Sequence, residues 1–516
     1  MSTQESLRRA AGVTAILVGT VCVYAIRQVD PDLYGHLAYG RYFAASGLAG
    51  IDPFAYTTSG AHWVAFEYLA QIAIWFAYAA LGPAGLIVLK SIIGGTAVWL
   101  LWMSIRSTTE EPHVYLPVFV LCTVPLTRYF LFRPQLFTFV CFAAFVAVLF
   151  RTLLRHRAPL WVLPPLMLTW VNTHAGFIAG IGALGLSLLI RVSANVHQHR
   201  GSSGRPWFSD TGQLFTTLAA CCAVTLATPW RLDLWRYIAA ELVHGTNRRY
   251  VAEWQPVSWA REPWSAISLA AILGALTLAT WSSAGRRRRV HGLPPWQWAA
   301  TCAPLLAMAM LSVRHVPLAA IWSAPVISLL ATSGWNAGRG QTFARLWLIV
   351  TTTAALPLVA AVLYVAEHPA PRIAVGGVLL GSRDPCRAAA FLRINHVRGN
   401  IFTPLWWGSY LTWQLSPDMR VSMDGRNISA FPDPTVLENL RFYTQQTGSD
   451  PATPLQYDTD LLLVPADAPV LAAVRQSHLW QSLYADEDAA LFTRSDRPVR
   501  SNETRVPPPA CSPYLQ

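Results

Sequence analysis

The chain has 516 residues, of which 53% are hydrophobic and only 13% are charged, and its mean hydropathy is +0.35. This composition excludes an ordinary soluble protein and predicts an α-helical polytopic membrane protein. The formal net charge of +12 does not indicate nucleic-acid binding, because the arginines occur in short clusters between apolar segments, as in the cytoplasmic loops of membrane proteins.

The N-terminal apolar segment predicts a membrane anchor. Arg8 and Arg9 precede an apolar run over residues 11–26, and no small-residue cleavage site separates this run from Asp30. We therefore expect an uncleaved helix with its N-terminus in the cytoplasm. The loop that follows this helix is then on the outer side of the membrane.

This first loop, residues 29–67, gathers acidic and histidine side chains in a chain where charges are scarce. Pro31 keeps Asp30 out of the helical region, and Asp32 can then cap a helix that runs to about residue 46. Asp32 and His36 are four residues apart and share one helix face, a spacing that suits a metal ion or an acid–base pair. The alternative interpretation is simple capping and a solvated histidine.

Carboxylates next to a bilayer lose solvation and tend to have raised pKa values. Because this is costly, such carboxylates usually have a chemical function. We therefore take Asp30, Asp32, His36 and Glu67 as the candidate catalytic residues.

Apolar segments of membrane-spanning length follow in chain order. They cover residues 64–81, 83–105, 114–130, 134–150, 160–190 with a turn at 172–174, 213–227, 264–281, 296–311, 317–331 and 346–366. The expected total is about 11 to 13 spanning helices. Basic clusters near residues 106, 151, 191, 286 and 339 are expected in the cytoplasm. This alternation requires an odd number of crossings between residues 64 and 105, where the pattern shows two apolar segments.

Alternation places a second set of polar residues in outward-facing loops. The set comprises Arg128, Arg133, Arg248, Arg249, Arg314, Asn172, His174, Glu253 and His315. Guanidinium groups bind phosphate through two parallel hydrogen bonds, so the set predicts a site for a phosphate or diphosphate group. The alternatives are headgroup contacts for the arginines and satisfied turn backbone for Asn172 and His174.

After Glu367 the hydropathy falls, and strand-like and helical patterns alternate. Strands are expected at residues 399–403, 420–423 and 460–464, helices at 406–415, 434–445 and 469–477, and a terminal hairpin at 480–484 and 489–493. This order predicts a small α/β domain. Asp424 and Arg426 follow a strand, so Asp424 is either at a carboxyl-end crevice that binds substrate or in a strand-ending turn.

The expected domains are a transmembrane domain over residues 1–366, which includes the acidic first loop, an extracytoplasmic α/β domain over 367–496, and a disordered tail over 497–516. Cys386 and Cys511 are the cysteines of the polar C-terminal part, and whether they form a disulfide is left open.

Several motifs resemble the GT-C class of integral-membrane glycosyltransferases, and more closely a largely uncharacterised bacterial GT-C-like group. They are Asp30-Pro31-Asp32 with His36 and Gly40, residues 52–57 with Trp63 and Glu67, 133–137, 170–177, 252–256, 314–317, 407–411 and 424–426. Phe66 and Tyr68 depart from this group, which often has tryptophan and histidine there. The resemblance covers most of the chain.

The resemblance implies a glycosyltransferase, inverting in type, that moves a sugar from a polyprenyl-phosphate donor to a glycan, lipid or protein acceptor outside the cytoplasm. The implied general base is Asp30, and the implied role of Asp32 is its partner or a metal ligand. Asp30, Asp32 and His36 would hold a divalent cation such as Mg or Mn. The implied location is the bacterial inner membrane, with no nucleic-acid partner.

Two other classes of function are compatible with the same features. Apolar spans that carry arginines also occur in transporters and lipid flippases for anionic substrates, although no inverted repeat is evident. A non-catalytic envelope assembly protein on a GT-C scaffold is the third class, since a fold does not fix a function.

Overall fold

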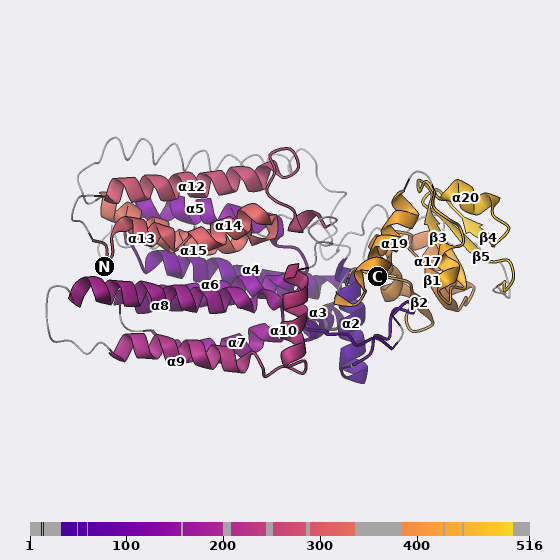
Figure 1. Cartoon of the computed structure of the whole chain (residues 1–516), viewed down its shortest axis with the longest axis horizontal. Helices are drawn as coiled ribbons and strands as arrows, with labels where there is room; N and C mark the ends of the chain where they lie inside the picture. Colours follow the sequence, from indigo (N-terminus) through magenta and orange to yellow (C-terminus); the bar gives the residue numbers. More distant parts are fainter. Residues whose placement is uncertain are drawn as a thin grey trace. The chain divides into compact units, whose positions relative to one another are not determined.

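The computed structural model describes residues 32–48, 50–58, 60–155, 158–199, 208–243, 251–284, 289–335, 384–426, 429–445 and 448–498, with Gly12 and Thr14 (Figure 1). By its contacts the chain divides into two compact units. Unit 1 is Met1–Arg27, Val88–Leu232 and Gly245–Arg372, and unit 2 is Gln28–Ile87, Asp233–His244 and Ile373–Gln516. The first loop, which we expected within the transmembrane domain, thus belongs to the same unit as the C-terminal domain. The expected domain boundary at residue 366 and the tail beyond residue 498 lie outside the described residues.

Unit 1 is a bundle of apolar helices (Figure 1). In chain order these are α4 (Pro83–Arg106, in this unit from Val88 onward), α5 (Pro112–Tyr129), α6 (Gln135–Arg155), α7 (Leu163–Val171), α8 (Ile178–His199), α9 (Phe208–Val224), α12 (Pro263–Ser283), α13 (Pro295–Ala300), α14 (Ala303–Leu311) and α15 (Val316–Trp335). Within the described residues, five helices are long and apolar enough to cross a membrane. The chain is therefore a multi-pass membrane protein. The expected span at 346–366 lies outside the described residues.

Helix α15 forms the centre of the bundle. Every residue from Val316 to Ala331 is buried, and the helix packs against α5, α6, α12 and α14. A helix that is apolar on all sides is expected in such a central position, because no face of it has to meet a polar environment.

Two breaks in the helices follow from local sequence. The segment predicted to fold back at residues 172–174 is interrupted there, with α7 ending at Val171 and α8 beginning at Ile178. The span expected at 296–311 is divided into α13 and α14, which was not predicted. Pro304 lies in the first turn of α14 and has no amide hydrogen for a continuous helix.

The two apolar segments between residues 64 and 105 differ in length. Helix α3 (Tyr68–Leu81) has 14 residues. At 1.5 Å per residue this is about 21 Å, shorter than the roughly 30 Å hydrocarbon core of a bilayer. Helix α4 has 24 residues, and Gly82, with a φ of 60°, separates it from α3. Of these two helices only α4 has the length of a crossing, which gives the odd number that the basic clusters require.

Unit 2 contains a five-stranded mixed sheet with strand order β2-β1-β3-β5-β4. Its strands are β1 (Gly399–Phe402), β2 (Met419–Val421), β3 (Leu461–Pro465), β4 (Trp480–Ala485) and β5 (Ala489–Arg494), and its helices include α17 (Cys386–Ile394), α18 (Leu405–Leu415), α19 (Asp433–Thr444) and α20 (Leu471–Gln476). Strand β1 is parallel to β2 and β3, and β5 is antiparallel to β3 and β4. The predicted α/β domain is confirmed.

The first loop is part of this sheet domain. Helix α2 (Asp32–Ser46) begins where Asp32 was expected to start a helix, and it packs against α3 and α18. Further along, the amide of Tyr56 donates to the carbonyl of Val421, and the amide of Val421 donates to the carbonyl of Phe54, both at 3.1 Å. The loop therefore continues the sheet beyond its edge strand β2.

Candidate functional site

Asp32 is the first residue of α2, and its carboxylate lies against a turn of the C-terminal domain. A Cβ atom added to Gly425 would overlap Oδ1 of Asp32 and would lie 2.9 Å from Oγ of Ser409. The amide of Gly425 donates to Ser409 Oγ at 3.0 Å. The start of α2, helix α18 and the turn after β2 therefore meet at this carboxylate. Asp30, the first choice for the base, lies outside the described residues.

His36 and Glu67 belong to the same unit, and both contact Gln71. His36 is buried, and Nε2 of Gln71 lies 3.3 Å from its Nδ1. Glu67 precedes α3, and its backbone carbonyl, not its side chain, accepts from the amide of Gln71. Among the described residues no three His, Cys, Asp or Glu side chains are grouped as metal ligands. The predicted ligand set includes Asp30, so this set stays a prediction.

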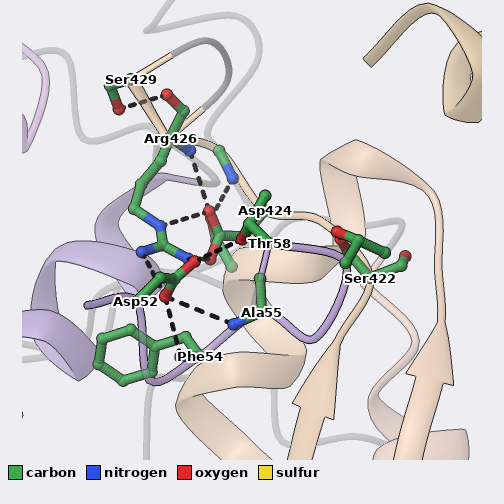
Figure 2. Close-up of polar contacts among 11 residues, drawn as sticks. Asp52, Phe54, Ala55, Thr58, Ser422, Asp424, Arg426 and Ser429 are labelled. Atoms are coloured by element: carbon green, nitrogen blue, oxygen red, sulfur yellow. Dashed lines mark hydrogen bonds and ion pairs between the residues drawn. The ribbon is translucent and has the colours of Figure 1, made fainter. Parts of the chain in front are cut away.

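Asp424 and Arg426, predicted to contact substrate, form a buried ion cluster with Asp52 (Figure 2). Arg426 donates from Nη1 and Nη2 to the two carboxylate oxygens of Asp52 at 2.8 and 2.9 Å. It also donates from Nε and Nη2 to the two oxygens of Asp424, both at 2.8 Å. The side chains of Asp424, Asp52 and Arg426 are 0%, 1% and 5% exposed. All three charges are therefore engaged inside the protein.

Aromatic rings enclose this cluster. The guanidinium carbon of Arg426 is 4.5 Å from the ring centre of Trp63 and 4.9 Å from that of Tyr39, and the rings of Phe54 and Phe431 are also close. Burial alone would lower the pKa of Arg426, but Asp424 and Asp52 raise it well above its usual value. Arg426 is therefore a permanent cation, held by charge and by stacking.

The cluster fixes the first loop onto the C-terminal domain. Asp52 also accepts from the amide of Phe54 at 2.9 Å and from the hydroxyl of Thr58 at 3.1 Å, which closes the loop around its carboxylate. Asp424 likewise accepts from the amide of Arg426, as expected for a turn after a strand. This geometry favours the strand-ending turn over the substrate-binding crevice as the interpretation of Asp424.

In unit 1, three of the predicted anion-binding residues form a network. Nη1 of Arg133 donates to Glu253 at 2.8 Å, and Nη1 of Arg314 lies 3.7 Å from the other carboxylate oxygen. The ring of Trp254 stacks 4.3 Å from the guanidinium of Arg314. Burial disfavours the charged form of Glu253, but Arg314 and Arg133 outweigh it and lower the pKa of this carboxyl. Two cations thus share one anion.

Two prolines restrict the backbone next to this network. Arg133 precedes Pro134, which restricts it to extended conformations just before α6 begins. Gln255 precedes Pro256 and is extended, so the segment after Glu253 runs beside residues 310–313. There the hydroxyl of Ser312 donates to the carbonyl of Glu253 at 3.1 Å. His315 is next to Arg314 in the short 3-10 turn Val313–His315 that precedes α15.

Asn172 and His174 satisfy the turn between α7 and α8. Asn172 donates from Nδ2 to the carbonyls of Leu168 and Ala227 at 2.8 and 3.2 Å. Nδ1 of His174 accepts from the amide of Gly176 at 2.9 Å and lies 2.9 Å from the hydroxyl of Thr138. These contacts match the alternative interpretation, in which both residues stabilise the turn.

Arg248 and Arg249 lie outside the described residues, and Arg128 is in α5 with a side chain that the structure does not describe.

The prediction missed two residues that belong to these clusters. Lys90, the only lysine of the chain, is buried in α4, with Nζ 4.8 Å from the ring centre of Phe132. Phe132 precedes Arg133, so Lys90 adds a cation at the same end of the bundle. A lone lysine in an apolar span was the signal, since such residues usually have a function. Asp52 was part of the motif at residues 52–57 but was not assigned a role, and its partner is 374 positions away in the sequence.

The polar loops of unit 1 meet at one end of the bundle. Arg133 contacts the loop of Glu253 and Arg314, and the hydroxyl of Thr138, one turn into α6, contacts His174. Arg191 instead donates to the carbonyl of Thr152, near the opposite end of α6. The polar loops and the basic residue Arg191 therefore lie at opposite ends of α6. The alternation of basic and polar loops predicts this arrangement.

No family model matches the chain, and no curated protein matches its sequence. Solved structures do match. The archaeal oligosaccharyltransferase AglB from Archaeoglobus fulgidus, in complex with an inhibitory peptide and a dolichol-phosphate, matches with a TM-score of 0.52 and 11% identity, over 88% of this chain and 69% of that one. A second structure of the oligosaccharyltransferase from A. fulgidus, in complex with Zn and sulfate, matches with a TM-score of 0.51 and 11% identity, over 93% and 73%.

The arabinofuranosyltransferase AftD from Mycobacteria matches with a TM-score of 0.55 and 14% identity, over 94% of this chain and 41% of that one. These proteins are GT-C glycosyltransferases. The similarity confirms that the chain has the fold of this class, as its motifs suggested.

Proposed function

We propose that this protein is an inverting glycosyltransferase that moves a sugar from a polyprenyl-phosphate donor to an acceptor hydroxyl outside the cytoplasm. The observation that carries the proposal is the polar end of the bundle in a GT-C fold. There Lys90, Arg133 and Arg314 provide three cations, and Glu253 lies beside the two arginines. Guanidinium and ammonium groups suit the phosphate of a lipid-linked donor.

The first-loop carboxylates activate the acceptor in this proposal. Asp30 removes the proton from the acceptor hydroxyl, and Asp32 orients the reacting groups. The hydroxyl oxygen then attacks the anomeric carbon, and the bond from that carbon to the phosphate oxygen breaks. The phosphate leaves with the electron pair, and the configuration at the anomeric carbon is inverted.

We assign the phosphate of the donor to the cations of unit 1. Negative charge develops on the phosphate as the bond breaks, and fixed guanidinium groups stabilise it without reorganising. Glu253 holds Arg133 and Arg314 in place, because each guanidinium group lies beside a different one of its two carboxylate oxygens. A divalent cation bound by Asp30, Asp32 and His36 would supply a positive charge beside the first-loop carboxylates, and the oligosaccharyltransferase from A. fulgidus has been solved with Zn.

The acceptor, a glycan, lipid or protein, is proposed to meet the sugar on the outer side of a bacterial inner membrane. A disulfide at Cys386 supports an extracytoplasmic C-terminal domain, because disulfides persist in oxidising compartments. The partner of Cys386 lies outside the described residues. Activated nucleotide sugars are cytoplasmic, so a transferase on the outer side needs a donor that the membrane itself carries.

Transfer from a radiolabelled polyprenyl-phosphate sugar to envelope acceptors tests the proposal in purified full-length protein. D30N and D32N should each abolish transfer while insertion into the membrane stays intact, because an amide cannot take or hold the proton. D467N, at an exposed position of the C-terminal domain, is the matched control and should transfer normally.

Two results would replace the proposal by its alternatives. Flux of the lipid-linked substrate into proteoliposomes without covalent transfer would indicate a transporter or flippase. Neither flux nor transfer, with an altered envelope in a deletion strain, would indicate an assembly protein.

A further inference from the structure

Glycines bring three elements of unit 2 into close contact around Ser409. A Cβ on Gly35 in α2 would lie 3.0 Å from Ser409 Oγ and 2.8 Å from the hydroxyl of Tyr39. A Cβ on Gly408 in α18 would overlap the backbone carbonyl of Met423, just after β2. A Cβ on the third glycine, Gly425, would meet the side chains of Ser409 and Asp32. Side chains at these positions would separate α2, α18 and the turn after β2.

Gly425 and Gly408 differ in the kind of atom that an added Cβ would meet. The space beside Gly408 is filled by backbone, which cannot move aside. The space beside Gly425 is filled by the tip of the Asp32 side chain, whose Cγ is 3.1 Å from the position of an added Cβ. The position of the Asp32 carboxylate therefore depends on residue 425 having no side chain.

The turn that carries Gly425 is fixed on both sides. Asp424 and Arg426 flank it, and both are locked in the buried cluster with Asp52. Ser409 holds the amide of Gly425 itself. A turn that is fixed in this way can restrict the neighbouring Asp32 carboxylate to one position. A reacting group requires such a fixed position.

We propose that the Asp424-Gly425-Arg426 turn, together with Ser409, is a positioning device for the first-loop carboxylate Asp32. The inference rests on the proposed function, in which Asp32 orients the reacting groups. It gives the C-terminal domain a role in the reaction: Asp52, Asp424 and Arg426 act through the turn, and Gly425 acts on Asp32. These residues are positioning residues and not substrate ligands.

Gly425→Ala is the decisive variant, because its methyl group would push aside a flexible carboxylate and leave the backbone in place. We expect kcat for sugar transfer to fall by about 100-fold, the usual scale for a displacement of about 1 Å, with the acceptor KM and the Tm little changed. The acid limb of the pH–kcat profile should also shift, which a purely structural role would not cause. Gly50→Ala is the matched control in the same unit, since a Cβ there would meet no atom within 4 Å.

A cross-link tests the contact without relying on activity. In the double variant D32C/G425C, mild oxidation should join the two positions, because the neighbouring atoms are within disulfide range. The control D32C/G50C should stay unlinked. Ser409→Ala provides a second activity test and should lower kcat in the same direction, by a smaller factor.

The results separate the inference from the proposed function. Kinetics of G425A equal to those of G50A, or no cross-link in D32C/G425C, would overturn the positioning device. If D32C/G425C forms the cross-link but the wild-type protein transfers no sugar, the proposed function is overturned instead, and with it the catalytic role of the turn.

Discussion

Arg426 carries an unusually large share of the polar contacts that hold unit 2 together. It meets four carboxylate oxygens and several aromatic rings, and almost none of its side chain reaches the surface. A buried charge of this kind is stable only while its partners are present, because each ion has lost its hydration. The cluster has one cation and two carboxylates, so loss of the cation leaves two uncompensated negative charges.

Replacement of this arginine by an uncharged residue should therefore be costly. We expect R426M to destabilise unit 2 by about 3 to 5 kcal/mol, the range found when one partner of a buried ion pair is removed. Thermal unfolding of the purified protein measures the effect. R441M, at an exposed position of α19, should change the Tm little. If R426M melted at the wild-type temperature, the cluster would not support the fold.

In unit 1, Glu253 has a place similar to that of Arg426 in unit 2, because it lies between two opposite charges. Its charge should make the free energy of unfolding depend on pH. Its pKa is lowered by Arg314 and Arg133, so its stabilising effect is complete above the usual glutamate pKa, about 4.3 in an unfolded chain. As the pH falls through the lower pKa of the folded state, the carboxylate is protonated and the effect is lost.

The Tm difference between the wild type and E253Q should thus be largest near neutral pH and disappear in strong acid. Melting curves from pH 7 down to pH 3 measure it, with E110Q, at an exposed loop position, as the control. A difference that stayed constant over this range would show that the charge of Glu253 does not stabilise the bundle.

At the scale of elements, the sequence was sufficient wherever local chemistry decides the structure. Helix α2 begins at Asp32, and the predicted strands and helices of the sheet domain agree with the observed ranges to within two residues, whereas α17 was not predicted. Periodicity and capping are read from neighbouring residues, and this explains the agreement. The division of residues 296–311 into α13 and α14 was missed, although Pro304 was a signal for it.

Contacts between distant segments could not be read in this way. The pairing of the first loop with β2 and the ion cluster of Asp52 join parts of the chain that are far apart in sequence. No local pattern links Asp52 to Arg426, since each residue also fits an exposed turn. The acids of the first loop were recognised as a group, but which of them act on substrate and which hold the loop depends on these long-range contacts.

At the scale of the whole molecule, hydropathy and charge determine the expected orientation in the membrane. The short helix α3 leaves α4 as the crossing between the first loop and Arg106. The positive-inside rule then predicts that the loop after α4 is in the cytoplasm and the first loop outside. Since the first loop belongs to the same compact unit as the C-terminal sheet domain, that domain should be outside as well.

Cysteine labelling in intact cells tests this orientation. The described free cysteines are buried except Cys222, so a C222S background should give little signal. A membrane-impermeant maleimide should label T444C, at an exposed position of α19, in intact cells, and should label E110C, in the loop after α4, only after permeabilisation. Labelling of T444C only after permeabilisation would place the sheet domain, and with it the first loop of the same unit, in the cytoplasm. A GT-C transferase with that topology would have its first-loop carboxylates on the cytoplasmic side, where nucleotide sugars are available and a lipid-linked donor is no longer required.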